Sequence, residues 1–323
     1  MQYGRLTGID KPVSRLVLGT MIISAREPER SFALLDAVME RGGNAFDTAN
    51  VYAGGESERG LGDWMQARGN REQVVILSKG CHPNQDRRRV TPADLTVDIY
   101  DSLARLKTDY VDGYMLHRDD LEVPVGPIVE RFNAHLEAGD IRAFGGSNWT
   151  HGRIAEANAY AEAHGLQGFT LSSPNFGLAE QVDDPWGPGC VSISGPQNAG
   201  ARAWYLESGV PVFAYSSLAR GFFSGRVAPE TWEQDIEALD GAARQAYCHA
   251  INVKRLERVY QLAGQYGVGV PQIALAYILA SPLEVYPLVG AANADEYEQN
   301  LKAFDVPLSE QECDWLDLRR VSL

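Results

Sequence analysis

The sequence predicts an α/β protein built as a closed (β/α)8 barrel. Short apolar runs alternate with helical patterns about every 30 to 40 residues, as repeated strand–helix units require. This alternation recurs eight times along the chain. A doubly wound sheet usually opens with a glycine-rich G-x-G-x-x-G turn after its first strand, whereas the first strand here ends in GTMIIS. The count of eight and the missing turn favour the barrel, as a single domain over residues 1–323.

Eight segments are predicted as strands because each is a short apolar run. They are Leu16–Gly19, Ala45–Asp47, Val74–Lys79, Val111–His117, Ile141–Asn148, Phe169–Asn175, Val210–Ser217 and Val285–Gly290. Each is followed by a helical pattern, and three of these patterns carry clear end signals. The first helix starts at Glu29 and stops at a glycine pair. Another begins at Thr91 with Pro92 in its first position, and the last runs from Asn293 to Phe304.

Three further segments lie outside the alternation. Residues 1–16 are predicted to form a hairpin with a turn at Gly8, which caps the end of the barrel opposite the active site. Long inserts follow strand six at Ala179–Pro196 and strand seven at Arg220–Gly241. We expect both inserts to wall a substrate pocket, because long loops on a rigid scaffold commonly carry binding residues.

Composition excludes several classes of protein. A chain of 323 residues, 45% of them apolar, can bury a large core. No apolar run approaches the roughly 20 residues that span a bilayer, and the N-terminus is too polar for a signal peptide, so we expect a cytoplasmic protein without a membrane partner. The net charge of -14 argues against nucleic acid as a partner. The four cysteines form no C-x-x-C pair, which argues against a disulfide framework or a zinc site.

Four residues of the first 120 positions predict an active site: Asp47, Tyr52, Lys79 and His117. Three of them end predicted strands, and barrel active sites lie at the C-terminal ends of strands. Lys79 would favour the phenolate of Tyr52, Asp47 would keep Lys79 charged, and His117 would polarise a carbonyl oxygen. This grouping predicts carbonyl reduction with a hydride from nicotinamide. Alone, each residue has a plainer reading as a strand-end, turn or rim residue, and only the ordered set favours catalysis.

These motifs resemble the aldo-keto reductase family over nearly the whole chain. The three N-terminal pieces, similar to the family's aspartate-to-tyrosine segment, lysine strand and histidine strand, read FDTANVYAGGESERGLG, VILSKG and DYVDGYMLHRDD. The later pieces are IRAFGGSN, FAYSSLARG and the EQN that ends at Asn300. Several weak motifs in the correct order are more specific than any one of them. The segments SSPNFGLAE and PWGPGCVSIS also resemble bacterial members that are associated with sugar metabolism.

The resemblance implies a cofactor site. Ser147 and Asn148 match the pair that binds the nicotinamide carboxamide, and Tyr215 matches the aromatic residue that stacks on the nicotinamide ring. Ser172 and Ser173 lie near the position where the family typically has a glutamine. The pyrophosphate segment matches Ser216, Leu218 and Arg220. The whole implied set is Thr20, Met21, Asp47, Ser147, Asn148, Ser172, Tyr215, Ser216, Leu218, Arg220, Gly290, Ala291, Glu296 and Asn300.

The loop after the eighth strand, LVGAANADEYEQN, contains no cation. NADP-preferring relatives usually have lysine or arginine there for the 2′-phosphate, whereas Glu296 occupies the position of such an arginine here. A carboxylate repels a 2′-phosphate and accepts a hydrogen bond from a free ribose hydroxyl. We therefore expect NAD(P)(H)-dependent chemistry, with NAD(H) slightly preferred over NADP(H). The alternative is that Glu296 is a solvated acid at a helix N-terminus.

The expected substrate is a small aldehyde, ketone or sugar carbonyl. The residues expected around it are Met21, Tyr52, His117, Trp149, Trp186 and Phe222. A second hypothesis is a cofactor-binding regulatory subunit with slow turnover, as in the potassium-channel β subunits of this family. A metal-dependent hydrolase or isomerase is disfavoured, because the chain has no H-x-H or similar ligand cluster after its first strand, so no metal is expected.

Overall fold

The computed structural model describes residues 1–323 and contains a closed barrel of eight strands with a separate two-stranded hairpin. The barrel order is β10-β3-β4-β5-β6-β7-β8-β9, which confirms the predicted (β/α)8 fold. The chain divides into two compact units. The first consists of Met1–Ser173 with Gly290–Tyr297, and the second of Pro174–Val289 with Glu298–Leu323.

The N-terminal hairpin pairs β1 (Tyr3–Leu6) with β2 (Ile9–Ser14), as predicted. Gly8 in its turn has φ +84°, and a side chain there would also collide with the carbonyl oxygen of Arg142. Lys11 Nζ donates to Val74 O at 2.6 Å, and Ser14 N donates to Asn44 Oδ1 at 2.9 Å. Because Asn44 and Val74 directly precede β4 and β5, the hairpin contacts the N-terminal ends of these strands.

The barrel strands are short, buried and close to their predicted positions. Their bounds are β3 Val17–Gly19, β4 Ala45–Asp47, β5 Val75–Gly80, β6 Val111–Leu116, β7 Ile141–Ser147, β8 Leu171–Ser173, β9 Val212–Ala214 and β10 Val285–Val289. The predicted strands Phe169–Asn175 and Val210–Ser217 were too long, since only three residues of each belong to the ladder. An apolar run marks burial, whereas ladder length depends on where the partner strand ends.

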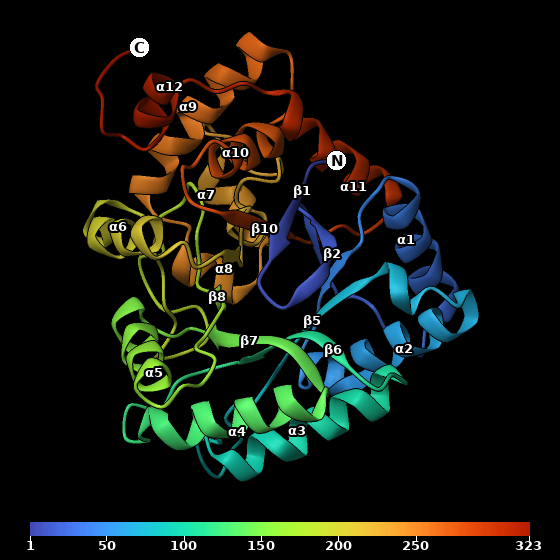
Figure 1. Ribbon diagram of the computed structural model, residues 1–323. Helices are drawn as coiled ribbons and strands as arrows, with labels where there is room; N and C mark the ends of the chain where they lie inside the picture. Colours follow the sequence, from blue (N-terminus) through green and yellow to red (C-terminus); the bar gives the residue numbers. More distant parts are fainter. The chain divides into compact units, whose positions relative to one another are not determined.

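In the first unit, helices follow one another around the outside of the strands (Figure 1). They are α1 Pro28–Glu40, α2 Glu56–Arg68, α3 Pro92–Leu106, α4 Val125–Ala138 and α5 His151–Ala163. The predicted start of α3 is confirmed, because Thr91 is its N-cap and Thr91 Oγ1 accepts from Asp94 N at 3.1 Å. Short 3-10 turns lie at Tyr52–Gly55 and Arg71–Gln73.

The remaining helices are α6 Ala199–Ser208, α7 Trp232–Asp235, α8 Gly241–Ala246, α9 Ala250–Tyr266, α10 Val270–Leu279, α11 Ala294–Leu301 and α12 Glu310–Leu316. The 3-10 turns among them are Pro196–Asn198, Ala219–Gly221, Ile236–Ala238 and Lys302–Asp305. The predicted helix Asn293–Phe304 therefore ends early and continues as a 3-10 turn. No single helix has the length and apolar composition to span a membrane, and α9 with α10 meets that test only as a pair bent by 98°.

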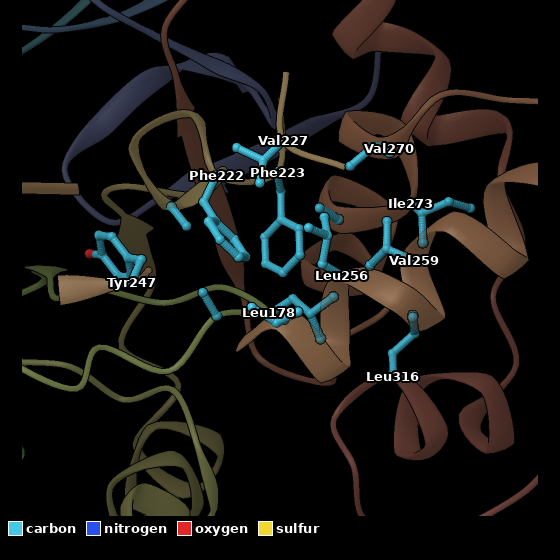
Figure 2. Close-up of a cluster of buried hydrophobic side chains, with 14 of the residues drawn as sticks. Leu178, Phe222, Phe223, Val227, Tyr247, Leu256, Val259, Val270, Ile273 and Leu316 are labelled. Atoms are coloured by element: carbon cyan, nitrogen blue, oxygen red, sulfur yellow. The ribbon is translucent and has the colours of Figure 1, made fainter. Parts of the chain in front are cut away.

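The second unit has its own hydrophobic core (Figure 2). Phe222 and Phe223 lie side by side facing Leu256, and Tyr247 lies at one end of the cluster with its hydroxyl directed away. Phe222 is 0% exposed. Its prediction as a substrate-pocket residue was therefore wrong: the ring is part of the core, where burying a phenylalanine contributes about 1.5–3 kcal/mol.

Candidate active site

The four residues of the predicted tetrad lie together in the first unit. Asp47 ends β4 and Lys79 lies in the neighbouring parallel strand β5, in which Leu77 pairs with Asp47. Lys79 Nζ lies 2.5 Å from Asp47 Oδ1, 3.1 Å from Thr48 O and 3.4 Å from Tyr52 Oη. Asp47 and Lys79 are 3% and 2% exposed, so this ion pair is almost completely removed from water.

The buried pair keeps Lys79 charged. Burial is the largest influence on its pKa and lowers it, but Asp47 and Tyr52 together outweigh burial and hold the Lys79 pKa above its ordinary value. Burial also raises the pKa of Asp47, against the opposing effect of the Lys79 ammonium. A charged ammonium 3.4 Å from the phenol oxygen stabilises the negative charge that Tyr52 acquires when it releases its proton.

A sharp turn places Tyr52 over this pair. Tyr52 opens the 3-10 turn Tyr52–Gly55, in which Ala53, Gly54 and Gly55 have φ values of 50°, 65° and 91°. Glycine adopts such left-handed conformations without steric cost, so the glycine pair lets the chain reverse directly into α2. Tyr52 is half-buried and its ring has Lys79 Nζ 5.1 Å from its centroid.

His117 follows β6, and its amide donates to Gly80 O at 2.8 Å. Its ring lies 5.6 Å from that of Tyr52, measured between centroids. Burial first, and then the positive charge of Lys79, the neighbouring His82 ring and the charge of Arg118, hold the pKa of His117 well below its ordinary value. The imidazole is therefore neutral at physiological pH, able to donate one hydrogen bond to a carbonyl oxygen but not to act as an imidazolium acid.

This lowered pKa predicts how stability depends on pH. Below about pH 6.5, His117 binds a proton in the unfolded chain but stays unprotonated in the folded chain. The free energy of unfolding therefore falls as pH falls. In the His117→Gln variant we expect this fall to be shallower by about 1.4 kcal/mol per pH unit, down to the depressed folded pKa. Urea unfolding of both chains between pH 4.5 and 8 measures the difference. Identical pH dependences would contradict a neutral, buried His117.

Thr20 and Met21, both predicted to contact the cofactor, lie in contrasting environments. Thr20 is 0% exposed, and its Oγ1 donates to Asp47 O at 2.9 Å and lies 2.8 Å from Ser57 Oγ. Thr20 therefore anchors the end of β4 rather than offering an open polar group. Met21 is 56% exposed beside Ile22, so its side chain is available to a ligand.

The carboxamide pair ends β7. Ser147 Oγ donates to Ser173 O at 2.9 Å, and Asn148 Nδ2 donates to His117 O at 3.2 Å, which ties this pair to the histidine of the tetrad. Asn148 has φ 58°, a left-handed conformation that asparagine tolerates better than most residues. A nicotinamide carboxamide carries both a hydrogen-bond donor and an acceptor. A serine hydroxyl and an asparagine amide also carry donors and acceptors, so they can pair with it. Ser147 and Asn148 have the chemistry that this group needs, and they are 2% and 5% exposed, while Ser172 is 0% exposed.

Trp149 does not line an open pocket, which corrects its prediction. It is 1% exposed, its indole nitrogen donates to Arg118 O at 3.1 Å, and its ring packs 5.0 Å from that of Phe169. The flanking polar residues suggested a loop position, but the ring fills space beneath the start of α5.

The second unit holds Tyr215, matched to the residue that stacks on the nicotinamide ring, together with Trp186 and the residues matched to the pyrophosphate segment. Tyr215 is half-buried and its hydroxyl donates to Val191 O at 3.3 Å. Trp186, 45% exposed, lies 5.7 Å from the Tyr215 ring and 5.1 Å from the Arg220 guanidinium. Arg220 Nη2 pairs with Asp240 Oδ2 at 2.5 Å.

The same segment has an unusual backbone. Ser216, Ala219 and Arg220 have φ values of 53°, 49° and 53°. These left-handed residues form tight turns, in which Ala219 N donates to Ser216 O at 2.7 Å and Gly221 N donates to Leu218 O at 3.0 Å. Leu218, by contrast, packs against the hydrophobic cluster of Figure 2. The match of this segment to the pyrophosphate position remains a prediction, while the Leu218 side chain contributes to the core.

After β10, Glu296 lies in the first turn of α11. Its Oε2 accepts from Ala292 N at 2.8 Å, and its own amide donates to Asn293 Oδ1 at 2.9 Å. These contacts agree with the alternative interpretation, in which Glu296 is an acid at the helix N-terminus. Gly290 is exposed, Ala291 is 3% exposed and Asn300 is 5% exposed.

One neighbour of the tetrad was missed by the sequence interpretation. The ring of His82 lies 4.9 Å from that of His117, measured between centroids. The available signal was its place in CHPN, directly after the lysine strand. A histidine there looked like a loop residue, because nothing in the sequence shows that the turn brings it against His117.

Comparison with known proteins identifies the family. A model described as the Aldo/keto reductase family matches residues 15–318, and the chain belongs to this family. A norsolorinic acid reductase of Emericella nidulans is 28% identical over 93% of the chain and 76% of its own length. A putative aryl-alcohol dehydrogenase of Saccharomyces cerevisiae is 26% identical over 98% of the chain and 86% of its own length.

A solved structure shares the fold along the whole chain. A thermostable aldo-keto reductase in complex with the inhibitor epalrestat superposes with a TM-score of 0.74 and 25% identity, covering 98% of this chain and 99% of the other. The protein is thus an NAD(P)H-dependent oxidoreductase of the aldo-keto reductase family, with a fold that binds small-molecule carbonyl substrates and a nicotinamide cofactor.

Proposed function

We propose that the protein interconverts a small aldehyde, ketone or keto-sugar and the corresponding alcohol in the cytoplasm, with Tyr52 as the general acid and base. The observation that carries this proposal is the position of Lys79 Nζ, 2.5 Å from Asp47 Oδ1 and 3.4 Å from Tyr52 Oη. A buried ammonium held beside a phenol is the arrangement that makes a tyrosine a competent proton donor near neutral pH.

The chemistry follows from the protonation states of these side chains. When bound, nicotinamide supplies the hydride to the carbonyl carbon. Tyr52 gives its proton to the carbonyl oxygen and becomes a phenolate, whose charge Lys79 stabilises. Neutral His117 donates a hydrogen bond to the same oxygen and polarises the carbonyl. In the direction of alcohol oxidation, the Tyr52 phenolate takes the proton back.

The substrate class has two candidates. The motifs similar to bacterial members associated with sugar metabolism support a hydroxylated carbonyl. The names of the relatives, norsolorinic acid reductase and aryl-alcohol dehydrogenase, support an aromatic carbonyl instead. Exposed Met21, with Ile22 at 40% exposure and Val51 at 42%, supplies apolar surface near the end of β3 and the β4 loop that suits either class.

We also propose that NAD(H) binds more tightly than NADP(H). The first turn of α11 carries Asp295 and Glu296, both exposed, and its loop has no lysine or arginine. Two carboxylates repel a 2′-phosphate even though one Glu296 oxygen accepts from Ala292 N. The capping contact leaves the charge in place, so the electrostatic argument does not require a direct bond from Glu296 to ribose.

Substitution of Glu296 separates charge from capping. Glu296→Gln keeps an oxygen for Ala292 N and removes the charge, so we expect a smaller penalty for NADPH with little change for NADH. Glu296→Arg should shift selectivity toward NADPH by about 10-fold or more. Dissociation constants from quenching of tryptophan fluorescence, measured with each cofactor on all three chains, test this. Tighter binding of NADPH by the wild type would overturn the NAD(H) preference.

Turnover on a panel of carbonyl compounds tests the function itself. We expect consumption of NADH with small aldehydes, ketones, keto-sugars or aromatic aldehydes. A chain that binds NADH yet turns over none of them would instead support the cofactor-binding regulatory subunit. Failure to bind either nicotinamide would contradict both.

A further inference from the structure

His82 is the one ring beside the tetrad that the proposed chemistry does not use. Its ring centroid lies 4.9 Å from that of His117 with the planes at 79°, and His117 lies 5.6 Å from Tyr52. The two donors to the carbonyl oxygen, Tyr52 and His117, are thus neighbours, and His82 extends this group of rings beyond His117. A side chain packed against His117 is close to the place where His117 would bind the carbonyl oxygen.

The turn that places His82 is held by buried contacts. Cys81 has φ 59° and is 0% exposed, and its amide donates to Asp98 Oδ2 at 2.7 Å. Arg89 in turn binds Asp98, with Nη2 2.6 Å from Oδ1 and Nη1 2.9 Å from Oδ2. The end of β5 is therefore linked through Asp98 to Arg89, and these protein contacts hold the turn that carries His82.

The hydrogen bond of His82 determines its tautomer. Nδ1 lies 2.8 Å from Pro83 O, and a carbonyl oxygen only accepts, so Nδ1 carries the hydrogen. In the neutral ring Nε2 then carries a lone pair and is an acceptor. Burial is the largest influence and lowers the pKa of His82, with Arg118 and Arg89 adding to it against the contact with Pro83, so the ring is neutral at physiological pH.

In the proposed chemistry, the tetrad itself offers no acceptor for a second substrate group. Tyr52 and His117 both donate to the carbonyl oxygen, and the Asp47 carboxylate is buried against Lys79. A hydroxyl on the carbon next to the carbonyl needs an acceptor when it leaves water, because an unpaired buried hydroxyl is costly. The His82 ring, 4.9 Å from that of His117 between centroids, carries such an acceptor at Nε2.

We propose that His82 is a specificity-determining residue whose Nε2 accepts a hydrogen bond from a hydroxyl on the carbon adjacent to the reacting carbonyl. The preferred substrates are then α-hydroxy aldehydes and ketones, the class that includes open-chain sugars. This inference rests on the proposed carbonyl reduction. Of the two candidate substrate classes, the inference favours hydroxylated carbonyl compounds over aromatic ones.

A matched pair of aldehydes tests the inference. Lactaldehyde and propanal differ by one hydroxyl on the carbon next to the carbonyl, and kcat/KM for each is measured in the wild type, His82→Leu and His82→Gln. We expect His82→Leu to lower kcat/KM for lactaldehyde about 10-fold and to change that for propanal by less than about 2-fold. His82→Gln, which keeps an acceptor oxygen, should recover part of the loss. Thermal melting of each variant checks folding.

The outcomes separate this inference from the proposed function. An equal loss with both aldehydes in His82→Leu would show that His82 only supports His117, and it would overturn the inference while leaving carbonyl reduction in place. An unchanged preference for lactaldehyde would overturn it in the same way. If the wild type reduces neither aldehyde with NADH or NADPH, the proposed function fails and the inference fails with it.

Discussion

The Tyr52→Phe variant is expected to lose carbonyl reduction by about 10²- to 10⁴-fold in kcat while binding nicotinamide normally. The substitution removes one oxygen from a half-buried ring and leaves the ion pair of Lys79 with Asp47 intact, at 2.5 Å. The hydride donor is unaffected, but the carbonyl oxygen then has no proton donor, since neutral His117 cannot replace one. Steady-state rates and fluorescence titration with NADH measure the two effects separately.

A second tyrosine provides the control. Tyr160 in α5 also has a hydrogen-bonded hydroxyl, to Glu130 Oε1 at 2.6 Å, but lies away from the tetrad. Tyr160→Phe should therefore keep wild-type kcat and wild-type cofactor affinity. If Tyr52→Phe retains near wild-type reduction, Tyr52 is not the general acid and the mechanism proposed for this site is wrong.

The Lys79→Met variant is expected to lose both activity and stability. It leaves the Asp47 carboxylate buried without its partner, and breaking a buried pair in this way costs about 3–5 kcal/mol in the free energy of unfolding. Carbonyl reduction should fall by about 10²-fold or more, because no ammonium stabilises the Tyr52 phenolate. Urea unfolding and steady-state kinetics give the two quantities.

The double variant Asp47→Asn/Lys79→Met separates these effects. It removes the uncompensated charge, so we expect it to recover much of the lost stability without recovering activity. An exposed pair is the matched control: Lys107 Nζ lies 2.7 Å from Asp63 Oδ1 with side chains 45% and 37% exposed. Lys107→Met should cost less than about 1 kcal/mol. A cost for Lys79→Met no larger than this control would contradict a buried, energetically coupled pair.

The predictions that differ from the structure concern the environments of single side chains. Trp149 was placed in a substrate pocket because loop residues flank it, and Phe222 was also expected there, yet both rings are buried. Glu296 was matched to a ribose contact, whereas its oxygen accepts from Ala292 N. In each case the side chain's environment depends on atoms from other parts of the fold or on local backbone geometry, which flanking residues do not reveal.

The sequence alone determined the barrel and the membership of its tetrad. Strand–helix alternation is a local pattern, and in a barrel every strand end points to one face, so residues at strand ends are brought together by topology alone. Only the tertiary structure decided the ladder lengths and the position of His82 against His117. The position of His82 depends on the left-handed turn at Cys81, which the contact of Arg89 with Asp98 supports, and the ladder lengths depend on where neighbouring strands end. Both are set by the folded chain as a whole.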